Sequence, residues 1–184
     1  LGDHHMSQKN LFFEGSSHVP LLIMPPQGRS LPQNISVEAP TDLVDLYPTI
    51  LAMAGLSSPV SVSGRNLLEP VPMDRIFFGN SLNRNFCVME EKVKLVYSAV
   101  GDHVLLFDLN TDPMEQHNLA EDPAWQERKA KLWKLLLEHT AQYTPEALDE
   151  NGQFLTYEAP HFPGDVPGRW FGFHYHDYSV DTFH

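Results

Sequence analysis

The chain has 184 residues, a length that suits one domain or slightly more. Hydrophobic residues make up 42% of it and aromatic residues 11%, which is enough apolar surface to bury a substantial core. The net charge of −12 argues against nucleic acid or an anionic membrane as the main partner, because both repel an acidic surface. No apolar run approaches the ~20 residues that a membrane-spanning helix requires, so no membrane span is expected.

The first eighteen residues are rich in His, Ser and Asn and predict a polar loop. Near its start the loop carries Asp3, His4 and His5, and Lys9 follows. Adjacent histidines would point apart on a regular strand, and zinc sites need three or four ligands together, so a metal site is the weaker interpretation. Lys9 is a point cation that suits an oxyanion such as sulfate or phosphate, although a solvated surface lysine has the same local pattern.

Two apolar elements are predicted before residue 60. Val19–Met24 is a continuous apolar run closed by two prolines, which is typical of a strand buried in a mostly parallel sheet. Thr41–Gly55 predicts a helix, with Asp45 as its N-cap and Gly55 as its C-terminal stop. We expect this helix to bury an apolar stripe formed by Leu43, Leu46, Tyr47, Ile50, Leu51 and Ala54.

The hydrophobic pattern changes to a period of two after 57–73, a stretch rich in Ser, Pro, Val and Gly that predicts a long loop. Antiparallel strands are predicted at 75–80, 85–90, 93–97 and 104–109. Gly101 and Asp102 predict the tight turn before the last strand. Asp122 and Pro123 then predict the start of a long helix that ends near residue 142 and lies across the strands.

The one cysteine, Cys87, cannot form an intrachain disulfide and lies among alternating apolar residues. We therefore expect a buried strand residue and not a reactive thiol. Residues 144–184 are irregular but carry many aromatic side chains, which would not stay in water as a disordered tail. We expect this extension to pack over the body or against another chain, which would make the protein a homo-oligomer.

Several motifs, taken in chain order, resemble those of the sulfatase family. Leu1–Lys9, followed by Glu14, resembles the family's Leu-Gly-x-His-Gly-x-x-x-Lys loop and the glutamate after it. His18–Leu21 resembles its Arg-Val-Pro-Leu strand. Two departures are that His5 stands where the family has glycine, and that His18 stands where it has arginine.

The later motifs follow in the family's order. Leu43–Leu51 resembles its Val-Asp-Leu-x-Pro-Thr-Leu-Leu helix, and Gly64–Leu68 resembles its Gly-Arg-Ser-Leu-Leu segment. Leu106–Leu119 resembles its Leu-Tyr-Asp-Leu-x-x-Asp-Pro-x-Glu-x-x-Asn-Leu turn. Together the motifs cover roughly residues 1–140, and they identify the chain as similar to the C-terminal portion of a sulfatase.

The resemblance implies an α/β, alkaline-phosphatase-like fold. The chain would supply the end of the large mixed sheet and a small antiparallel sheet packed on a long helix. The expected divisions are 1–72 for the end of the catalytic domain, 73–143 for the small sheet and helix, and 144–184 for the aromatic extension.

The resemblance also implies hydrolysis of sulfate esters on a sulfated small molecule or glycan. The family uses formylglycine, made from a Cys/Ser-x-Pro-Ser-Arg motif, and calcium or another divalent cation. That motif does not occur here, so we expect the chain alone to be inactive, to hold no metal or cofactor, and to need an N-terminal catalytic part. Lys9 maps to a sulfate-contacting role and His4 to the loop histidine beside it.

Two alternatives stay open. The same fold could serve a phosphonate monoester or phosphodiester hydrolase, because the nucleophile and the metal ligands decide which oxyanion is handled. The chain could instead be a non-catalytic oligomerisation module, an interpretation that the aromatic extension favours.

Overall fold

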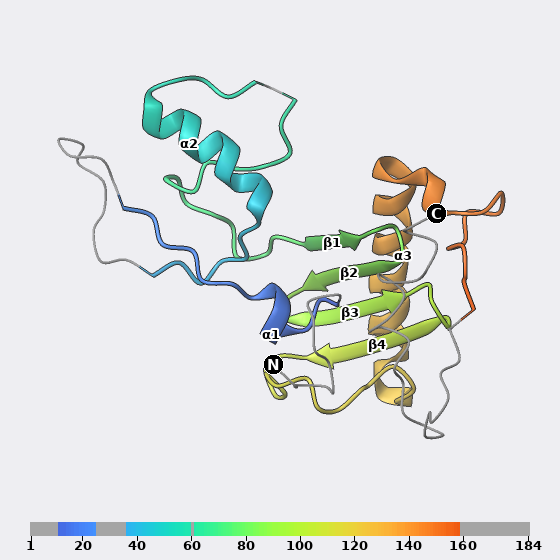
Figure 1. Cartoon of the computed structure of the whole chain (residues 1–184). Helices are drawn as coiled ribbons and strands as arrows, with labels where there is room; N and C mark the ends of the chain where they lie inside the picture. The colour runs from blue at the N-terminus through green and yellow to red at the C-terminus, as the bar shows by residue number, and fades with distance from the viewer. Residues whose placement is uncertain (1–10, 25–35, 60, 159–184) are drawn as a thin grey trace, which may run out of the picture. The chain divides into compact units, whose positions relative to one another are not determined.

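The computed structural model describes residues 11–24, 36–59 and 61–158, which fall into two compact units (Figure 1). One unit combines the N-terminal segment, up to Val19, with the chain from Phe78 onward. The other unit is formed by Pro20–Phe77. The first unit therefore joins two segments that are far apart in the sequence.

A four-stranded sheet with the order β1-β2-β3-β4 forms the centre of the first unit. The strands are β1 (Phe77–Ser81), β2 (Asn85–Glu90), β3 (Val93–Ser98) and β4 (His103–Asp108). β2 and β3, and β3 and β4, pair in antiparallel register. The meander predicted from the period-two pattern is thus confirmed, with strand ends that differ from the prediction by one or two residues.

Each connection between neighbouring strands contains two residues with positive φ. They are Leu82 and Asn83, then Glu91 and Lys92, and finally Gly101 and Asp102. Two positive φ values are the signature of the turn whose twist matches that of the flanking strands. The Gly-Asp turn was predictable from its residues, whereas leucine, glutamate and lysine rarely adopt this conformation and gave no such signal.

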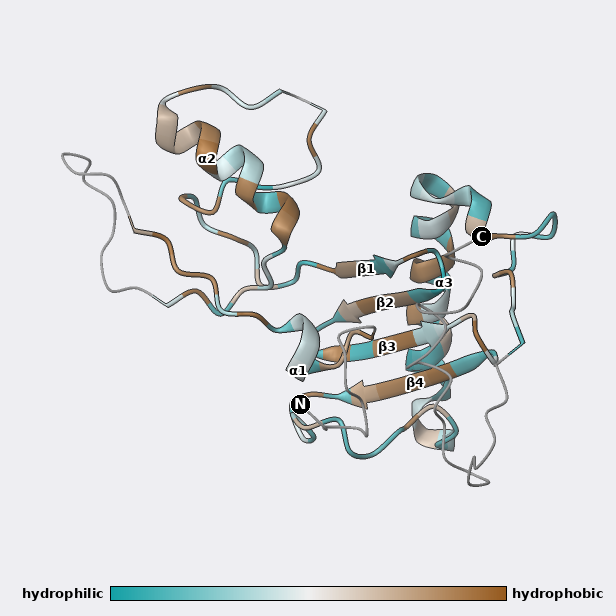
Figure 2. Ribbon diagram, in the orientation of Figure 1, coloured by the Kyte–Doolittle hydropathy of each residue, from teal (hydrophilic) through white to brown (hydrophobic). Residues whose placement is uncertain are grey.

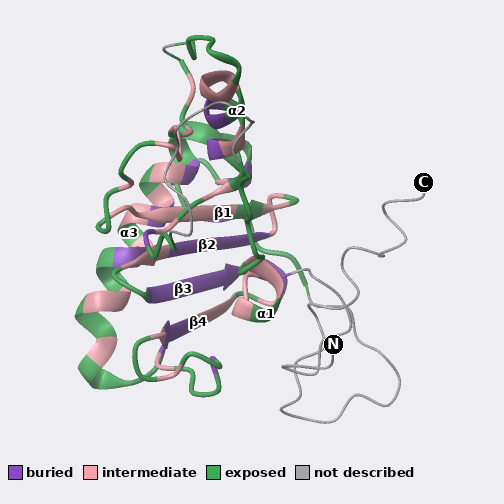
Figure 3. Cartoon of the chain, turned by 90° about the vertical axis from the view of Figure 1, so that its left-hand side faces the viewer, coloured by how far each residue is buried: buried purple, intermediate pink, exposed green. Residues whose placement is uncertain are grey.

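Helix α3 (Gln126–Tyr143) covers one face of the sheet (Figure 3). Asp122 caps the short 3-10 turn before it by accepting a hydrogen bond from Ala124 N–H, with Pro123 at the first helical position, as predicted. Leu132 and Leu136 are fully buried against the strands. Figure 2 shows both brown and teal residues along α3, and its contacts with β2 and β3 place the long helix across the strands, as expected.

Aromatic rings fill the space between α3 and the sheet. The ring of Tyr97 on β3 lies 4.9 Å from that of Trp133 on α3 and 4.7 Å from that of Phe154. Phe86 on β2 completes the cluster, 4.5 Å from Phe154. The first residues of the C-terminal extension therefore pack over the body, as expected, while residues 159–184 lie outside the described part of the chain.

Helix α2 (Leu46–Ala54) is the main element of the second unit, and a 3-10 turn, Leu43–Asp45, leads into it. Gly55 ends the helix in the left-handed conformation, as predicted. Asp45 directly precedes α2, as predicted for its N-cap, but the prediction of a side-chain cap was wrong, because Asp45 makes no such hydrogen bond to α2 and Asp42 caps the 3-10 turn instead. Asp45 sits three residues later, and its carboxylate accepts a hydrogen bond from Asp42 N–H, which completes a capping box.

Two further predictions for this part of the chain were also wrong. Leu43, Tyr47 and Ile50 of the apolar stripe are 52–70% exposed, while the buried face of the helix carries Pro48 and Thr49. Val19–Met24 forms no strand and is exposed. A strand buried on both faces needs paired neighbours and a cover, and the described residues bring neither against this run.

Candidate functional site

The predicted site residues His4 and Lys9 lie outside the described residues, which begin at Leu11. What the structure shows is how the chain is fixed immediately after them. Leu11 is 4% exposed, and the short helix α1 (Glu14–Ser17) follows on the sheet face opposite α3 (Figure 3). The described contacts therefore show how the segment that follows Lys9 is attached to the sheet.

Aromatic contacts hold the segment on the sheet. Phe12 packs directly on the backbone of β1 at Gly79, where an added Cβ would lie 2.5 Å from the Phe12 ring. A side chain at this position would have to displace the Phe12 ring. The ring of Phe13 lies 5.9 Å from that of Phe107 on β4. The segment thus reaches across the sheet from an edge strand to the opposite edge.

A buried ion cluster fixes the same segment from below. Lys94 on β3 is 2% exposed, and its Nζ lies 2.6 Å from Glu14 Oε1 and 2.6 Å from Glu115 Oε1. It also donates a hydrogen bond of 2.8 Å to the carbonyl of Phe12. Glu14 N–H donates a hydrogen bond of 2.6 Å to Glu115 Oε2. Lys94 thus forms an ion pair with each carboxylate, and the pair with Glu115 Oε1 lacks hydrogen-bond geometry.

One imidazole, that of His18, and one thiol, that of Cys87, lie close to this cluster. His18, the departure from the family's arginine, is exposed, and its Nδ1 lies 2.9 Å from Glu14 Oε2. Cys87 on β2 is fully buried, as predicted, and this burial raises the pKa of its thiol to about 12. A thiol with that pKa is not a nucleophile at neutral pH.

The motif that begins at Leu106 builds a turn and not a catalytic group. Asn118 Oδ1 accepts hydrogen bonds from the N–H groups of Leu106 and Ala120. Asp112 Oδ2 accepts a hydrogen bond of 2.8 Å from His117 N–H. These side chains hold the loop after β4, which brings Glu115 to the sheet face where Lys94 and α1 lie.

Two motifs dock on each other in the second unit. Asp45 Oδ1 accepts a hydrogen bond of 2.8 Å from Arg65 N–H, and Thr49 Oγ1 accepts one of 2.9 Å from Leu67 N–H. The chain passes so close at Gly64 that an added Cβ would lie 1.9 Å from the carbonyl oxygen of Val44. The helix motif and the Gly-Arg motif are therefore one packing unit.

Asp45 is the charged centre of this second unit. It is fully buried and receives both Nη groups of Arg75, at 2.5 and 3.0 Å. Burial alone would raise the pKa of Asp45. Hydrogen bonds from the Arg75 guanidinium and from the backbone N–H groups of Arg65 and Asp42 outweigh burial and hold this pKa below its usual value.

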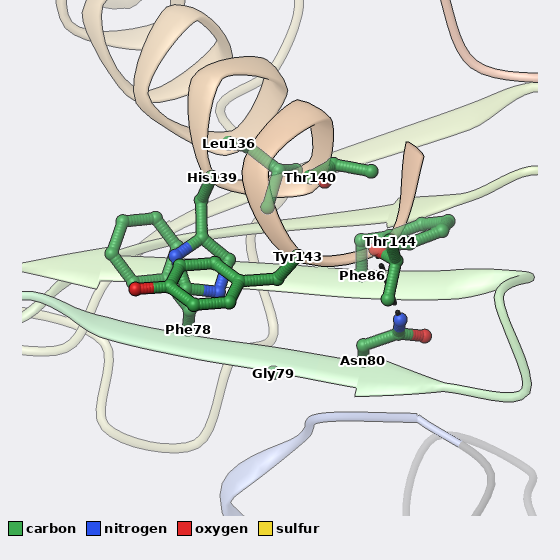
Figure 4. A pocket seen from close by; sticks show the side chains of 9 residues that line it. All are labelled: Phe78, Gly79, Asn80, Phe86, Leu136, His139, Thr140, Tyr143 and Thr144. Carbon is green, nitrogen blue, oxygen red and sulfur yellow. Dashed lines mark hydrogen bonds between the residues drawn. The ribbon is translucent and has the colours of Figure 1, made fainter. Parts of the chain in front are cut away.

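A small pocket lies where β1 and β2 meet the end of α3 (Figure 4). The His139 ring stacks on Phe78 with centroids 3.9 Å apart, and Tyr143 lies beside it. Burial lowers the pKa of His139, so the imidazole is neutral at pH 7. Asn80 and Thr144 close the other end with a hydrogen bond of 3.5 Å. None of the described residues that line this pocket carries a charge at neutral pH, so it does not suit a sulfate group.

Residues 11–24, 36–59 and 61–158 bring together no group of three or more His, Cys, Asp or Glu side chains that could hold a metal ion. No calcium ligand is therefore assigned within them. Within the same ranges, each helix is too short or too polar to cross a bilayer.

Lys94 and Arg75 are the cations of the two buried clusters, and neither was predicted from the sequence. In a strand with a period-two pattern a lysine is expected to face solvent, whereas every residue of β3, Lys94 included, is buried. The usable signal was the glutamate in each of two motifs, Glu14 and Glu115, since an acid that becomes buried, as Glu115 does, requires a cation beside it.

The comparisons with known proteins point to one family. No family model matches the chain. It is 34% identical over 137 residues to arylsulfatase K of Bos taurus, which covers 64% of this chain and 25% of that protein. It is 34% identical over 161 residues to choline-sulfatase of Rhizobium meliloti, which covers 81% and 30%. The sulfatase YidJ of Escherichia coli is 28% identical over 151 residues, with coverages of 76% and 29%.

Solved structures give weaker likenesses. A putative sulfatase from Bacteroides thetaiotaomicron matches 68% of this chain and 31% of its own, with a TM-score of 0.48 and 21% identity. A phosphonate monoester hydrolase of Agrobacterium radiobacter matches 63% and 29%, with a TM-score of 0.46 and 25% identity. In sequence this chain is similar to sulfatases, and it spans 25–30% of the length of the curated relatives that it matches.

Proposed function

We propose that this chain is the C-terminal part of a sulfuric ester hydrolase and takes part in sulfate ester cleavage within a longer protein. The observation that carries the proposal is the 34% identity to a choline-sulfatase over 81% of the chain. The structure supports it because Glu14, Asp45, Gly64 and Glu115, which belong to the family-like motifs, make specific buried or close-packed contacts.

In this proposal Lys9 binds an oxygen of the sulfate group, and His4 lies beside it. The lysine ammonium would neutralise charge that builds on the sulfuryl oxygens as the ester bond breaks. Formylglycine as the nucleophile and calcium as a Lewis acid would be supplied by the longer protein. The substrate would be a sulfated small molecule or glycan.

Exposed apolar residues support the need for an N-terminal catalytic part. The second unit leaves Leu22, Met24 and the Leu43, Tyr47, Ile50 stripe of α2 in contact with solvent. Soluble proteins rarely expose so many large apolar groups without a partner. We propose that the N-terminal catalytic part covers them.

The test is the replacement of Lys9 by alanine in the longer protein, with 4-nitrophenyl sulfate as substrate. We expect kcat/KM to fall by ~10²–10³-fold, the range for loss of one charge-stabilising donor. His4→Ala should also lower kcat, and Lys134→Ala, a change at an exposed lysine of α3, is the control. Normal kcat/KM in the Lys9 variant would show that the assignment of this lysine is incorrect.

A further inference from the structure

Lys94 faces the side of the sheet on which the N-terminal segment lies. Tyr97, three residues along β3, contacts Trp133 of α3, and side chains separated by an odd number of positions point to opposite faces of a strand. Lys94 therefore points away from α3, toward α1, where its Nζ lies 2.6 Å from Glu14 Oε1. Helices α1 and α3 lie on opposite faces of the sheet (Figure 3). Its ammonium is the cation that lies under the start of that segment.

The contacts of the ion cluster converge on three consecutive residues, Phe12 to Glu14. Lys94 holds the Phe12 carbonyl at 2.8 Å and the Glu14 carboxylate at 2.6 Å. Glu115, itself held by Lys94, accepts the Glu14 N–H. The backbone is thus fixed at both a carbonyl and an N–H, by groups that come from two distant parts of the sequence.

Stability alone gives a poor reason for this cluster. Buried ion pairs lose hydration on burial, and well-packed apolar residues of similar volume are often as stable or more stable. An apolar contact would not fix the direction of a carbonyl and an N–H, whereas paired charges do so. The arrangement is therefore suited to orienting the segment more than to strengthening the core.

We propose that Lys94, acting with Glu14 and Glu115, is a positioning residue for the segment Phe12–Glu14, which follows Lys9 by three residues in the sequence. Lys9 is three residues before Phe12, and three residues span at most about 11 Å. A change in the direction of the backbone at Phe12 would therefore change the region that the preceding residues, Lys9 among them, can reach. The catalytic consequence rests on the proposed function above, while the positioning itself does not.

The first experiment measures the positioning in the 184-residue chain. Lys94→Met alone leaves the buried Glu115 carboxylate and the partly exposed Glu14 carboxylate without their cation and can fail to fold. The main variant is therefore the double substitution Lys94→Met with Glu115→Leu, which replaces these two charges by apolar groups. Hydrogen exchange is followed at the amides of Glu14, Ser16 and Ser17, which are hydrogen-bonded in this structure. We expect these amides to exchange at least about tenfold faster while the β3 amides keep their protection. Unchanged exchange would overturn the proposal.

The second experiment measures catalysis by the longer protein that carries the same double substitution, with Lys134→Met as the matched control for loss of a lysine. We expect unchanged thermal stability, a kcat lowered by ~10–100-fold, and a smaller change in KM, because a misplaced group costs most in the transition state. Lys94→Arg, which keeps the charge, should recover part of kcat.

The outcomes separate the two hypotheses. If the double variant matches the unsubstituted longer protein in both thermal stability and kcat, the cluster is merely structural. If the unsubstituted longer protein does not turn over sulfate esters, the proposed function fails, while the exchange rates at Glu14, Ser16 and Ser17 still decide whether Lys94 positions the segment.

Discussion

At the scale of single residues, two buried charges organise the two units. Lys94 gathers Glu14 and Glu115 under the N-terminal segment, and Asp45 gathers Arg75 and the backbone of the Gly-Arg motif. Each lies at a position where the sequence alone indicated an ordinary strand or cap residue. A buried charge is stable only when all its partners are in place, so each one makes its unit depend on contacts between distant segments.

Asp45 predicts a specific pH dependence of stability. Its pKa is lowered in the folded state, so the stability it contributes is complete above the pKa of an unfolded aspartate, about 4, and is lost as the pH falls through the lower folded value. Denaturant unfolding at pH 7 and pH 3 should show a smaller pH-dependent loss in Asp45→Asn than in the unsubstituted chain. The exposed Asp74→Asn is the control. Equal pH-dependent losses in all three proteins would contradict this role of Asp45.

At the scale of elements, sequence signals predicted the local structure correctly but did not predict which elements pack together. The Asp122–Pro123 start of α3, the Gly55 stop of α2 and the period-two strands all follow from groups within a few residues of one another. Helical spacing places Tyr47 and Ile50 on one face but does not say what covers that face. The same limit explains why Val19–Met24 looked like a strand, since its pairing depends on residues elsewhere.

The cap of α2 shows the same limit on a smaller scale. Asp42 and Asp45 are both good N-cap residues, and the spacing does not choose between them. The choice is decided by Arg75 and by Arg65 N–H, which hold the Asp45 carboxylate away from its own helix. For the candidate site, the sequence supplied Lys9, His4 and the motif glutamates, while the cation that joins the glutamates became evident only from the structure.

Packing between two elements predicts the effect of a single methyl group. Gly64→Ala places a Cβ against the Val44 carbonyl, a backbone atom that cannot move aside without disturbing the start of α2. We expect a loss of ~1–3 kcal/mol in the free energy of unfolding, the usual range for overpacking. Gly152→Ala has open space around the Cβ but a φ of +72°, and it should show only the cost of that conformation, about 1 kcal/mol. A Gly64 variant as stable as the unsubstituted chain would show that the two motifs are not tightly docked.

At the scale of the whole molecule, the second unit exposes apolar side chains that are typical of an interface. Ile50→Glu replaces an exposed residue of α2 and should leave the thermal stability of the 184-residue chain unchanged. In the longer protein the same substitution should prevent the N-terminal catalytic part from packing on α2, because it places a charge in a contact that we propose is buried. Leu82→Glu, at an exposed residue of the other unit, is the control. If the Ile50 variant of the longer protein has normal light scattering and normal activity, this result would argue against the interface.

The central claim is that the chain works as the C-terminal part of a sulfatase and not alone. The most direct measurement is kcat/KM for 4-nitrophenyl sulfate and for an aryl phosphonate monoester, with calcium present, on the 184-residue chain and on the longer protein. We predict no turnover of either substrate by the chain, and a higher kcat/KM for the sulfate than for the phosphonate in the longer protein. Turnover by the chain alone, or a preference of the longer protein for the phosphonate, would contradict the account.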